Sequence, residues 1–415
     1  MIEMYQPSQV DIGWQQDSER LGFVRDDLAI DVGRMAAYRY KRLQEQIICN
    51  NCAGALLFSP MNVRYATETV YAPITNMHSP TRSVFVPGEG KAVLYESAEP
   101  DFKPLPDFIG EQRESRLTAY FIAGDAYFDR SRRWAREVAD LVRSRGGGSK
   151  RIAIDIAEPE FIVALHGEGL EVVNAERIVE RAAAIKSYDE LRCIVASVSV
   201  AERGLARIRD HLEAGVTEQS LWAHLSYENA ANGGEWFEYA ILVSGERTNP
   251  WGRECSDNVV RTGELVGVDT GMIGPYGYGA DVSRTFHCKP ATPSEEQKRL
   301  YQTAIENLSF NIGLIQAGMS FREFAEKSWA VPEEFWTRRY NSVAHGVGMG
   351  NEWPHIPFAE DKREGVFEEN MVMAIESCIG REDGCECVKL EDMVVVTNGK
   401  SQLLSTFAFE EDLFI

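Results

Sequence analysis

Apolar residues recur at helical spacing near the start of the chain and then give way to short β-type runs. The helical pattern predicts a helix from Met35 to Cys49, and a second one covers Ala135–Arg145. The β-type runs are rich in branched and aromatic residues: Gly54–Phe58, Ser83–Pro87, Lys91–Tyr95 and Arg151–Asp155. This alternation predicts an α/β N-terminal domain over residues 34–180, preceded by a polar, irregular arm at residues 1–33.

The second half of the chain contains one pattern twice. Each copy has two helices separated by an Ala-Gly corner, followed by two β-type segments. The first corner, Ala214-Gly215, precedes a helix capped by Thr217, and the second, Ala317-Gly318, precedes a helix opened by Ser320. Corners and β-type segments recur with an offset of about 105 positions. We therefore predict an α+β C-terminal domain, residues 181–415, built from a duplicated ααββ unit.

Each copy of this unit places two carboxylates in its apolar β-type segments. Asp269 and Asp281 belong to the first copy, in the segments Leu265–Asp269 and Ala280–Phe286. Glu376 and Glu391 belong to the second, in the segments Met371–Glu376 and Val388–Val396. A carboxylate buried among apolar side chains is costly unless it is paired or binds a metal. Asp392 is adjacent to Glu391, and only one of two neighbouring residues in a strand can face a given side. The repeat favours Glu391.

An imidazole completes this candidate ligand set. His345 precedes a glycine-rich stretch that lets the backbone approach closely. Four carboxylates and one imidazole form a hard, oxygen-rich set that suits Mn, Fe, Co or Zn. Four negative charges also balance two divalent cations, so we predict a centre with two divalent metal ions.

Composition narrows the class of protein. The chain has 415 residues, with 43 basic and 64 acidic side chains and a formal net charge of −21. That sign argues against a nucleic-acid partner and against binding to an anionic membrane surface. No apolar run is long enough to span a bilayer, and the first residues do not resemble a signal peptide. The lone Cys49-x-x-Cys52 pair is interpreted as two reduced thiols, so we expect a cytoplasmic protein.

Several short motifs in the second half of the chain each contain one of the candidate ligands. They are Asp269-x-Gly271, Gly277-Tyr278-x-x-Asp281-x-x-Arg284-Thr285, His345-Gly-x-Gly348, Glu376 and Glu391. Together they resemble the pita-bread metallopeptidase superfamily, which includes methionine aminopeptidases, aminopeptidase P, prolidase and the metal-free creatinases. The resemblance implies a pita-bread C-terminal domain that binds two metals, a creatinase-like N-terminal domain and a homodimer. The complete ligand set argues against a metal-free member.

The chain departs from the peptidases at two histidines. Peptidases of this superfamily carry one histidine after the Ser-Gly strand, but the segment Ser244–Trp251 contains none. They carry a second shortly after the ligand histidine, where this chain has Asn351 and Glu352. These histidines steady the substrate carbonyl and the tetrahedral intermediate. Ordinary aminopeptidase activity is therefore not expected.

A narrower resemblance extends over nearly the whole chain. The segments that carry it are Asn62–Thr67, Asn76-x-His78-x-Pro80, Gly233–Trp236, Ser244–Cys255 and His345–Pro354. They resemble the dimethylsulfoniopropionate lyase branch of the superfamily. The resemblance implies that Trp236, Trp251 and His78 contact substrate and that Tyr340 binds the sulfonium, a reasonable cation–π contact. The loop at residues 71–82 would then lie near an active site of the dimer.

The chain also departs from these lyases. Their extra aspartate, two residues after the first ligand, is Gly271 here, and the aspartate proposed as their general base is Asn351. An amide cannot accept a proton at neutral pH, whereas β-elimination requires a base. Glu352, a tyrosine or a metal-bound hydroxide would have to serve instead, or the reaction has changed.

Three functions therefore remain open. The first is a metal-dependent enzyme of the lyase-like branch, which cleaves a small carboxylate substrate with an onium or related tail by elimination. The second is a prolidase- or aminopeptidase P-like hydrolase of C–N bonds in a dipeptide or small amide. The third is a non-catalytic, dimeric binding module on the same fold.

Overall fold

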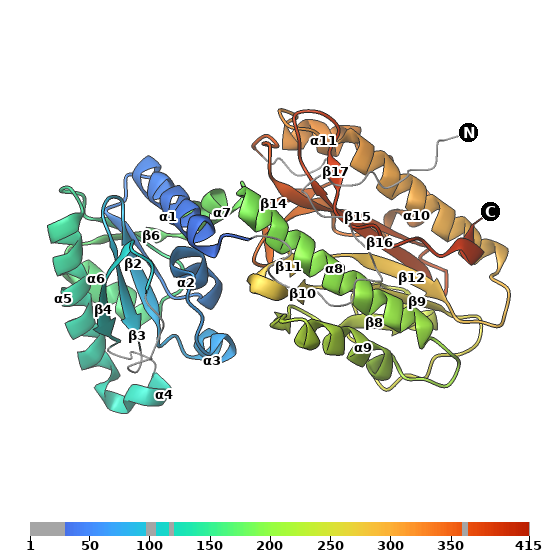
Figure 1. Cartoon of the computed structure of the whole chain (residues 1–415), viewed down its shortest axis with the longest axis horizontal. Coiled ribbons are helices and arrows are strands. Elements are labelled where there is room, and N and C mark those ends of the chain that lie inside the picture. Colours follow the sequence, from blue (N-terminus) through green and yellow to red (C-terminus); the bar gives the residue numbers. More distant parts are fainter. Residues whose placement is uncertain (1–29, 97–104, 116–119, 359–363, 415) are drawn as a thin grey trace. The chain divides into compact units, whose positions relative to one another are not determined.

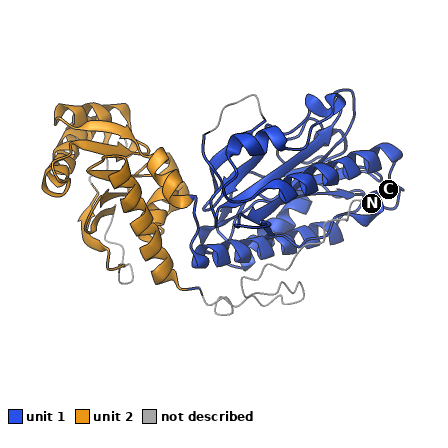
Figure 2. Cartoon of the chain, turned by 90° about the horizontal axis from the view of Figure 1, so that it is seen from above, with its two compact units in different colours: residues 1–30, 184–415 blue, residues 31–183 orange. Residues whose placement is uncertain are grey.

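The computed structural model describes residues 30–96, 105–115, 120–358 and 364–414. The described part of the chain divides into two compact units (Figure 2): residues 31–183 form one, and the residues from 184 onward form the other. Residues 1–29 of the predicted N-terminal arm lie outside the described residues. The arm was also predicted to continue to residue 33, but helix α1 already begins at Val32 because the Asp31 side chain caps the Arg34 N–H.

The unit of residues 31–183 is a mixed α/β layer structure (Figure 1). Its six-stranded sheet has the order β4-β3-β2-β1-β5-β6, and β1 pairs antiparallel with β2 and parallel with β5. The strands are β1 Gly54–Leu57, β2 Ser83–Pro87, β3 Ala92–Glu96, β4 Ile109–Glu114, β5 Arg151–Ile154 and β6 Glu171–Asn174. The helices are α1 Val32–Cys49, α2 Pro60–Thr67, α3 Pro73–His78, α4 Tyr120–Ala123, α5 Tyr127–Arg145, α6 Pro159–Gly167 and α7 Glu176–Ala183.

Two helices of the second unit begin at the caps that the sequence predicts: Thr217 closes a capping box, and Ser320 caps the Glu323 N–H. Ser187 and Ser294 also close capping boxes. The helices are α8 Tyr188–Asp210, α9 Glu218–Ala231, α10 Glu295–Leu314, α11 Phe321–Lys327 and α12 Glu333–Trp336. In each repeat, the corner glycine adopts positive φ, as an Ala-Gly helix stop requires.

The strands of this unit form a large sheet and a small one. The large sheet follows β14-β13-β15-β16-β12-β9-β8 with β17 beside β16, and the small sheet follows β11-β10-β7. The first group of strands is β7 Trp236–Phe237, β8 Ile241–Ser244, β9 Leu265–Asp269, β10 Met272–Ile273, β11 Gly279–Ala280 and β12 Ser283–His287. The second group is β13 Ser342–Val347, β14 Asn351–Pro357, β15 Val372–Gly380, β16 Cys387–Val395 and β17 Gln402–Leu403.

One predicted strand is broken in the structure. The sequence suggested a continuous β-type segment from Ala280 to Phe286, but Asp281 lies between β11 and β12, outside both. The hydroxyl of Thr270 donates to the Ala280 carbonyl at 2.8 Å and accepts from the Val282 N–H at 3.0 Å. A side chain therefore replaces the strand partner at this point, and the chain passes from the small sheet to the large one.

The large sheet has one apolar and one polar face near its centre. Helix α10 packs against β15 and β16, where Ile375, Leu390 and Val394 belong to a continuous hydrophobic core. Their immediate neighbours Glu376 and Glu391 point to the opposite face. None of the described helices is long and apolar enough to cross a membrane.

Candidate metal centre

Strand register brings three of the predicted ligands into one row. Ser283 in β12 pairs with both Asp269 in β9 and Glu391 in β16, and Glu391 pairs with Glu376 in β15. Directly paired residues point to the same face of a sheet. The two copies of the repeat therefore contribute carboxylates to one line across four adjacent strands.

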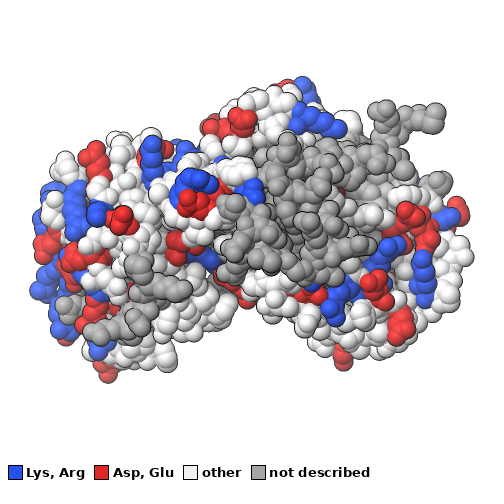
Figure 3. Space-filling view, viewed as in Figure 1, with Lys and Arg blue, Asp and Glu red and all other residues white. Residues whose placement is uncertain are grey.

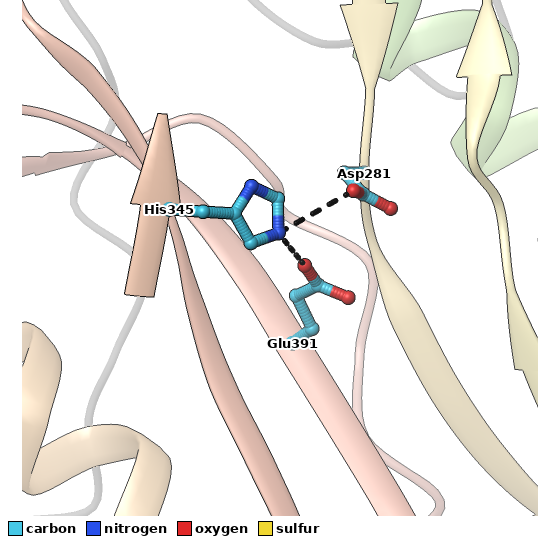
Figure 4. A group of neighbouring side chains, drawn as sticks. All are labelled: Asp281, His345 and Glu391. Carbon is cyan, nitrogen blue, oxygen red and sulfur yellow. Dashed lines mark ion pairs between the residues drawn. The ribbon is translucent and has the colours of Figure 1, made fainter. Parts of the chain in front are cut away.

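The imidazole of His345 faces these carboxylates from β13. Its Nε2 lies 3.2 Å from Glu376 Oε1, 3.6 Å from Glu391 Oε1 and 3.7 Å from Asp281 Oδ2. Figure 4 shows His345, Asp281 and Glu391 converging from three separate segments, with one potential ligand atom of each within 4.8 Å of the others. All five predicted ligands thus meet at one buried place.

The neighbouring Asp392 faces the other side of β16. Its Oδ1 accepts a hydrogen bond from the Arg284 guanidinium at 2.8 Å, and both side chains are buried. The structure therefore places Glu391, and not Asp392, among the carboxylates.

A buried lysine that sequence reasoning missed stands beside three of the carboxylates. Lys389 Nζ lies 2.7 Å from both Glu376 Oε2 and Glu391 Oε2 and 3.4 Å from Asp269 Oδ2. It also donates to the Ser283 hydroxyl at 2.8 Å. Lys389 precedes Glu391 by two positions, so strand alternation places this lysine on the same face as Glu391.

The cluster carries more negative charge than its own cations balance. Burial and then repulsion from Glu391 raise the pKa of Asp281 and of Glu376. Burial acts in the same direction on Glu391, but Lys389 and His345 outweigh it and lower the pKa of Glu391 to about 2. Four carboxylates compete here for one ammonium and one imidazole. A divalent cation would relieve this repulsion.

The donor set fits such a cation. Glu391 Oε1 is buried and accepts no hydrogen bond from any described residue, although a buried carboxylate oxygen normally has a partner. His345 Nδ1 contacts the Gly346 carbonyl at 3.1 Å, which leaves Nε2 directed at the carboxylates. Imidazole nitrogen together with carboxylate oxygen is the set that Mn, Fe, Co and Zn accept. Asp281, His345 and Glu391 can thus hold a metal ion.

Tyr239 is a second residue that sequence reasoning missed. Its hydroxyl lies 3.0 Å from Asp269 Oδ1 and 2.8 Å from Asp281 Oδ1, so it links these two carboxylates. A Cβ added to Gly271 would lie only 2.4 Å from the Tyr239 ring. An aspartate at position 271 and this tyrosine therefore exclude one another in the present arrangement.

Two predicted substrate-contact residues flank the lysine. The Lys389 Nζ lies 4.8 Å from the ring centroid of Tyr340 and 5.9 Å from that of Trp251, and both aromatic residues are half-buried. The Trp251 ring packs on Gly267, where an added Cβ would lie 2.6 Å away. Glu376 and then burial raise the pKa of Tyr340, so its phenol stays protonated. Two aromatic rings thus adjoin the carboxylate cluster.

Asn351 and Glu352 do not offer a free base. Asn351 is exposed at the start of β14. The Glu352 carboxylate pairs with the buried ammonium of Lys186, and it takes the space where an added Cβ at Gly348 would lie. Proton transfer to Glu352 would require that buried ion pair to be broken.

The other two predicted substrate-contact residues belong to different units. Trp236 is half-buried in β7, where it pairs with Ile273, and it makes no described contact with the five candidate ligands. His78 is exposed at the end of α3, in the unit of residues 31–183.

Comparison with known proteins gives one consistent family. A model described as metallopeptidase family M24 matches residues 192–398. The chain is 31% identical over 393 residues to a dimethylsulfoniopropionate lyase DddP of Roseovarius nubinhibens, covering 92% of this chain and 88% of the relative. It is 27% identical over 243 residues to a Xaa-Pro dipeptidase of Pyrococcus furiosus, covering 57% of this chain and 67% of the relative.

Solved structures agree on the fold. A Xaa-Pro dipeptidase from Bacillus anthracis superimposes with a TM-score of 0.72 at 20% identity, covering 91% of this chain and 99% of that one. The dipeptidase PepE from Mycobacterium ulcerans also gives 0.72, at 19% identity and with coverage of 92% and 98%. The predicted combination of an α/β domain with a duplicated pita-bread domain is confirmed. The chain belongs to metallopeptidase family M24 and is a metalloenzyme of that family.

Proposed function

We propose that this protein is a metal-dependent lyase that cleaves dimethylsulfoniopropionate, or a closely related onium carboxylate, by β-elimination. The observation that carries the proposal is the aromatic pair Tyr340 and Trp251 beside the carboxylate cluster. A lysine ammonium already lies near both rings, which indicates that this place accepts a cation. A sulfonium is likewise a cation with a weakly hydrated surface, suited to an aromatic face.

Whole-chain similarity supports the same reaction. The relative that matches 92% of the chain is a lyase, whereas the Xaa-Pro dipeptidase matches 57%. Both halves of the chain are therefore shared with the lyase. In this assignment Asp269, Asp281, His345, Glu376 and Glu391 hold two divalent ions of Fe, Mn, Zn or Co. Bound metal would neutralise the substrate carboxylate and thereby acidify the adjacent C–H bonds.

The protein's own side chains would orient the substrate. Tyr340 and Trp251 hold the onium end, and Tyr239 fixes Asp269 and Asp281 through its hydroxyl. This fixes the bond to the leaving group relative to the metal centre, which is the main requirement for elimination. His78 and Trp236 are assigned to the substrate only by the resemblance to the lyases.

The same proposal extends to the organisation of the protein. Residues 181–415 would be the metal-binding catalytic domain, residues 34–180 a creatinase-like domain, and the protein a cytoplasmic homodimer that binds a small carboxylate. On the face drawn in Figure 3, Lys and Arg side chains are interspersed with Asp and Glu side chains. This mixture supports a small-molecule substrate over a nucleic-acid partner, which would require a basic surface.

Dimethyl sulfide in the headspace is the direct test. Purified protein is loaded with Mn or Fe, its metal content is measured, and dimethylsulfoniopropionate is added with and without a chelator. We expect metal-dependent release, lost in Asp281→Asn and kept in Glu295→Gln, which changes an exposed carboxylate at the start of α10. Absence of release from protein that holds metal would reject this function.

The alternative is a hydrolase of C–N bonds, like the Xaa-Pro dipeptidases on the same fold. Gly271, where the lyases have an aspartate, is the observation in its favour. The same loaded protein is therefore offered a set of Xaa-Pro dipeptides. Cleavage of a dipeptide without release of dimethyl sulfide from dimethylsulfoniopropionate would establish the hydrolase. If neither reaction occurred, the result would favour the non-catalytic binding module.

A further inference from the structure

The proposed elimination needs a proton acceptor, and the two residues expected near that place do not provide one. Asn351 carries an amide, which cannot accept a proton at neutral pH. Glu352 is held by the buried Lys186. A base for the carbon-bound proton must therefore come from another part of the unit.

Glu238 places a carboxylate next to Asn351. It follows strand β7 directly, and its backbone N–H donates to the Gly271 carbonyl at 2.9 Å. Its two carboxylate oxygens lie 3.4 and 3.3 Å from the Asn351 backbone nitrogen. Glu238 thus connects the segment after Asp269 with the start of β14.

Glu238 directly precedes a residue that contacts the candidate metal centre. The next residue, Tyr239, contacts Asp269 and Asp281, so the backbone here runs along the edge of the carboxylate cluster. Glu238 itself is not a candidate ligand, and its side chain is exposed. It can therefore meet a substrate without losing a metal contact.

The surroundings of Glu238 also suit a base. Although part of Glu238 reaches solvent, the protein atoms around its carboxyl partly remove water from it and raise its pKa; the Asn351 N–H and His345 oppose this shift, and Asp269 adds to it. A carboxylate with a raised pKa holds an abstracted proton better than an ordinary one does.

We propose that Glu238 is the general base of the elimination and that it supplies, from the segment directly after β7, the carboxylate that position 351 lacks. This inference rests on the proposed function. Glu238 removes a proton from the carbon next to the substrate carboxylate, and that C–H electron pair becomes the new C=C bond. The C–S bond breaks with its pair on sulfur. The products are acrylate, dimethyl sulfide and protonated Glu238, which returns its proton to water.

The test compares Glu238→Gln with Glu235→Gln, an exposed glutamate three residues earlier in the same segment. Each full-length variant is loaded with Mn, and metal content, kcat and KM for dimethylsulfoniopropionate are measured across pH. We expect Glu238→Gln to hold as much metal as the wild type, to keep KM and to lose kcat by about 10²- to 10⁴-fold. The fall of kcat/KM at acidic pH should disappear with it, and Glu235→Gln should match the wild type.

Chemical rescue separates a base from a merely structural residue. Glu238→Ala should recover part of its rate when formate is added, in proportion to the formate concentration, whereas formate should not change the wild type. Three results would overturn the assignment of Glu238 and leave the lyase function standing. They are release of dimethyl sulfide by Glu238→Gln within tenfold of the wild-type rate, loss of metal from Glu238→Gln, and absence of rescue of Glu238→Ala by formate. If wild-type protein that holds metal released no dimethyl sulfide, both the lyase function and the role of Glu238 would be rejected.

Discussion

At the scale of single residues, Lys389 has the largest influence on the charge balance of the candidate metal centre. Its ammonium is buried and lies within 3.4 Å of three carboxylates, which would otherwise repel one another. In the absence of metal it acts as an internal counter-ion. When metal is bound, divalent charge takes over part of that role. The contribution of Lys389 to folding should therefore depend on metal.

The substitution Lys389→Met tests this dependence. In the presence of a chelator, the free energy of unfolding should fall by about 3–5 kcal/mol, because buried carboxylates lose their partner. With saturating Mn the loss should be clearly smaller. Denaturant unfolding of the variant and the wild type under both conditions measures the difference.

Lys186 offers a matched control, since it is another buried lysine paired with a carboxylate, that of Glu352. Lys186→Met should cost similar stability with and without metal, because Glu352 is not a candidate ligand. Equal losses for Lys389→Met in the two conditions would contradict the counter-ion role.

At the scale of elements, strand β16 separates two chemical roles by alternation. Glu391 faces the metal centre, and Asp392 faces Arg284 on the other side. Glu391→Gln should reduce the metal bound per chain, because a neutral amide is a weaker ligand than a carboxylate. Asp392→Asn should keep the metal but lower the melting temperature, since it leaves a buried guanidinium without its charged partner.

Metal analysis and thermal melting of these two variants check this prediction. The substitutions are adjacent and chemically equivalent, so each is the control for the other. Loss of metal in Asp392→Asn together with full metal content in Glu391→Gln would mean that Asp392, and not Glu391, faces the metal centre.

Much of this arrangement follows from local rules, and the remainder depends on distant contacts. The expected caps Thr217 and Ser320 located the starts of α9 and α11, and the repeat located the four carboxylates among the candidate ligands. The repeat selected Glu391, and strand alternation then places Lys389 on the same face, so that signal was present in the sequence. The ion pair of Lys186 and Glu352 joins positions 166 apart and could not be predicted from either segment. The break at Asp281 likewise depends on the Thr270 hydroxyl, which competes with strand pairing.

At the scale of the whole molecule, the candidate metal centre belongs to one unit. All five ligands, Lys389 and Tyr239 come from the unit of residues 184–415, and none comes from residues 31–183. Metal should therefore stabilise one compact unit directly. Binding to the folded state alone raises its stability by about 4 kcal/mol when the free metal concentration is a thousand times the dissociation constant.

Calorimetry of the full chain should show this difference. We expect two unfolding transitions, of which Mn raises the temperature of one and leaves the other nearly unchanged. Asp155→Ala identifies the unaffected transition, because Asp155 accepts hydrogen bonds from the Phe58 and Ser59 N–H groups within the unit of residues 31–183. Glu391→Gln should reduce the metal-dependent shift of the other. A single transition that Mn shifts as a whole would show that the two units unfold together, and equal shifts of two separate transitions would show that metal bound in one unit also stabilises the other.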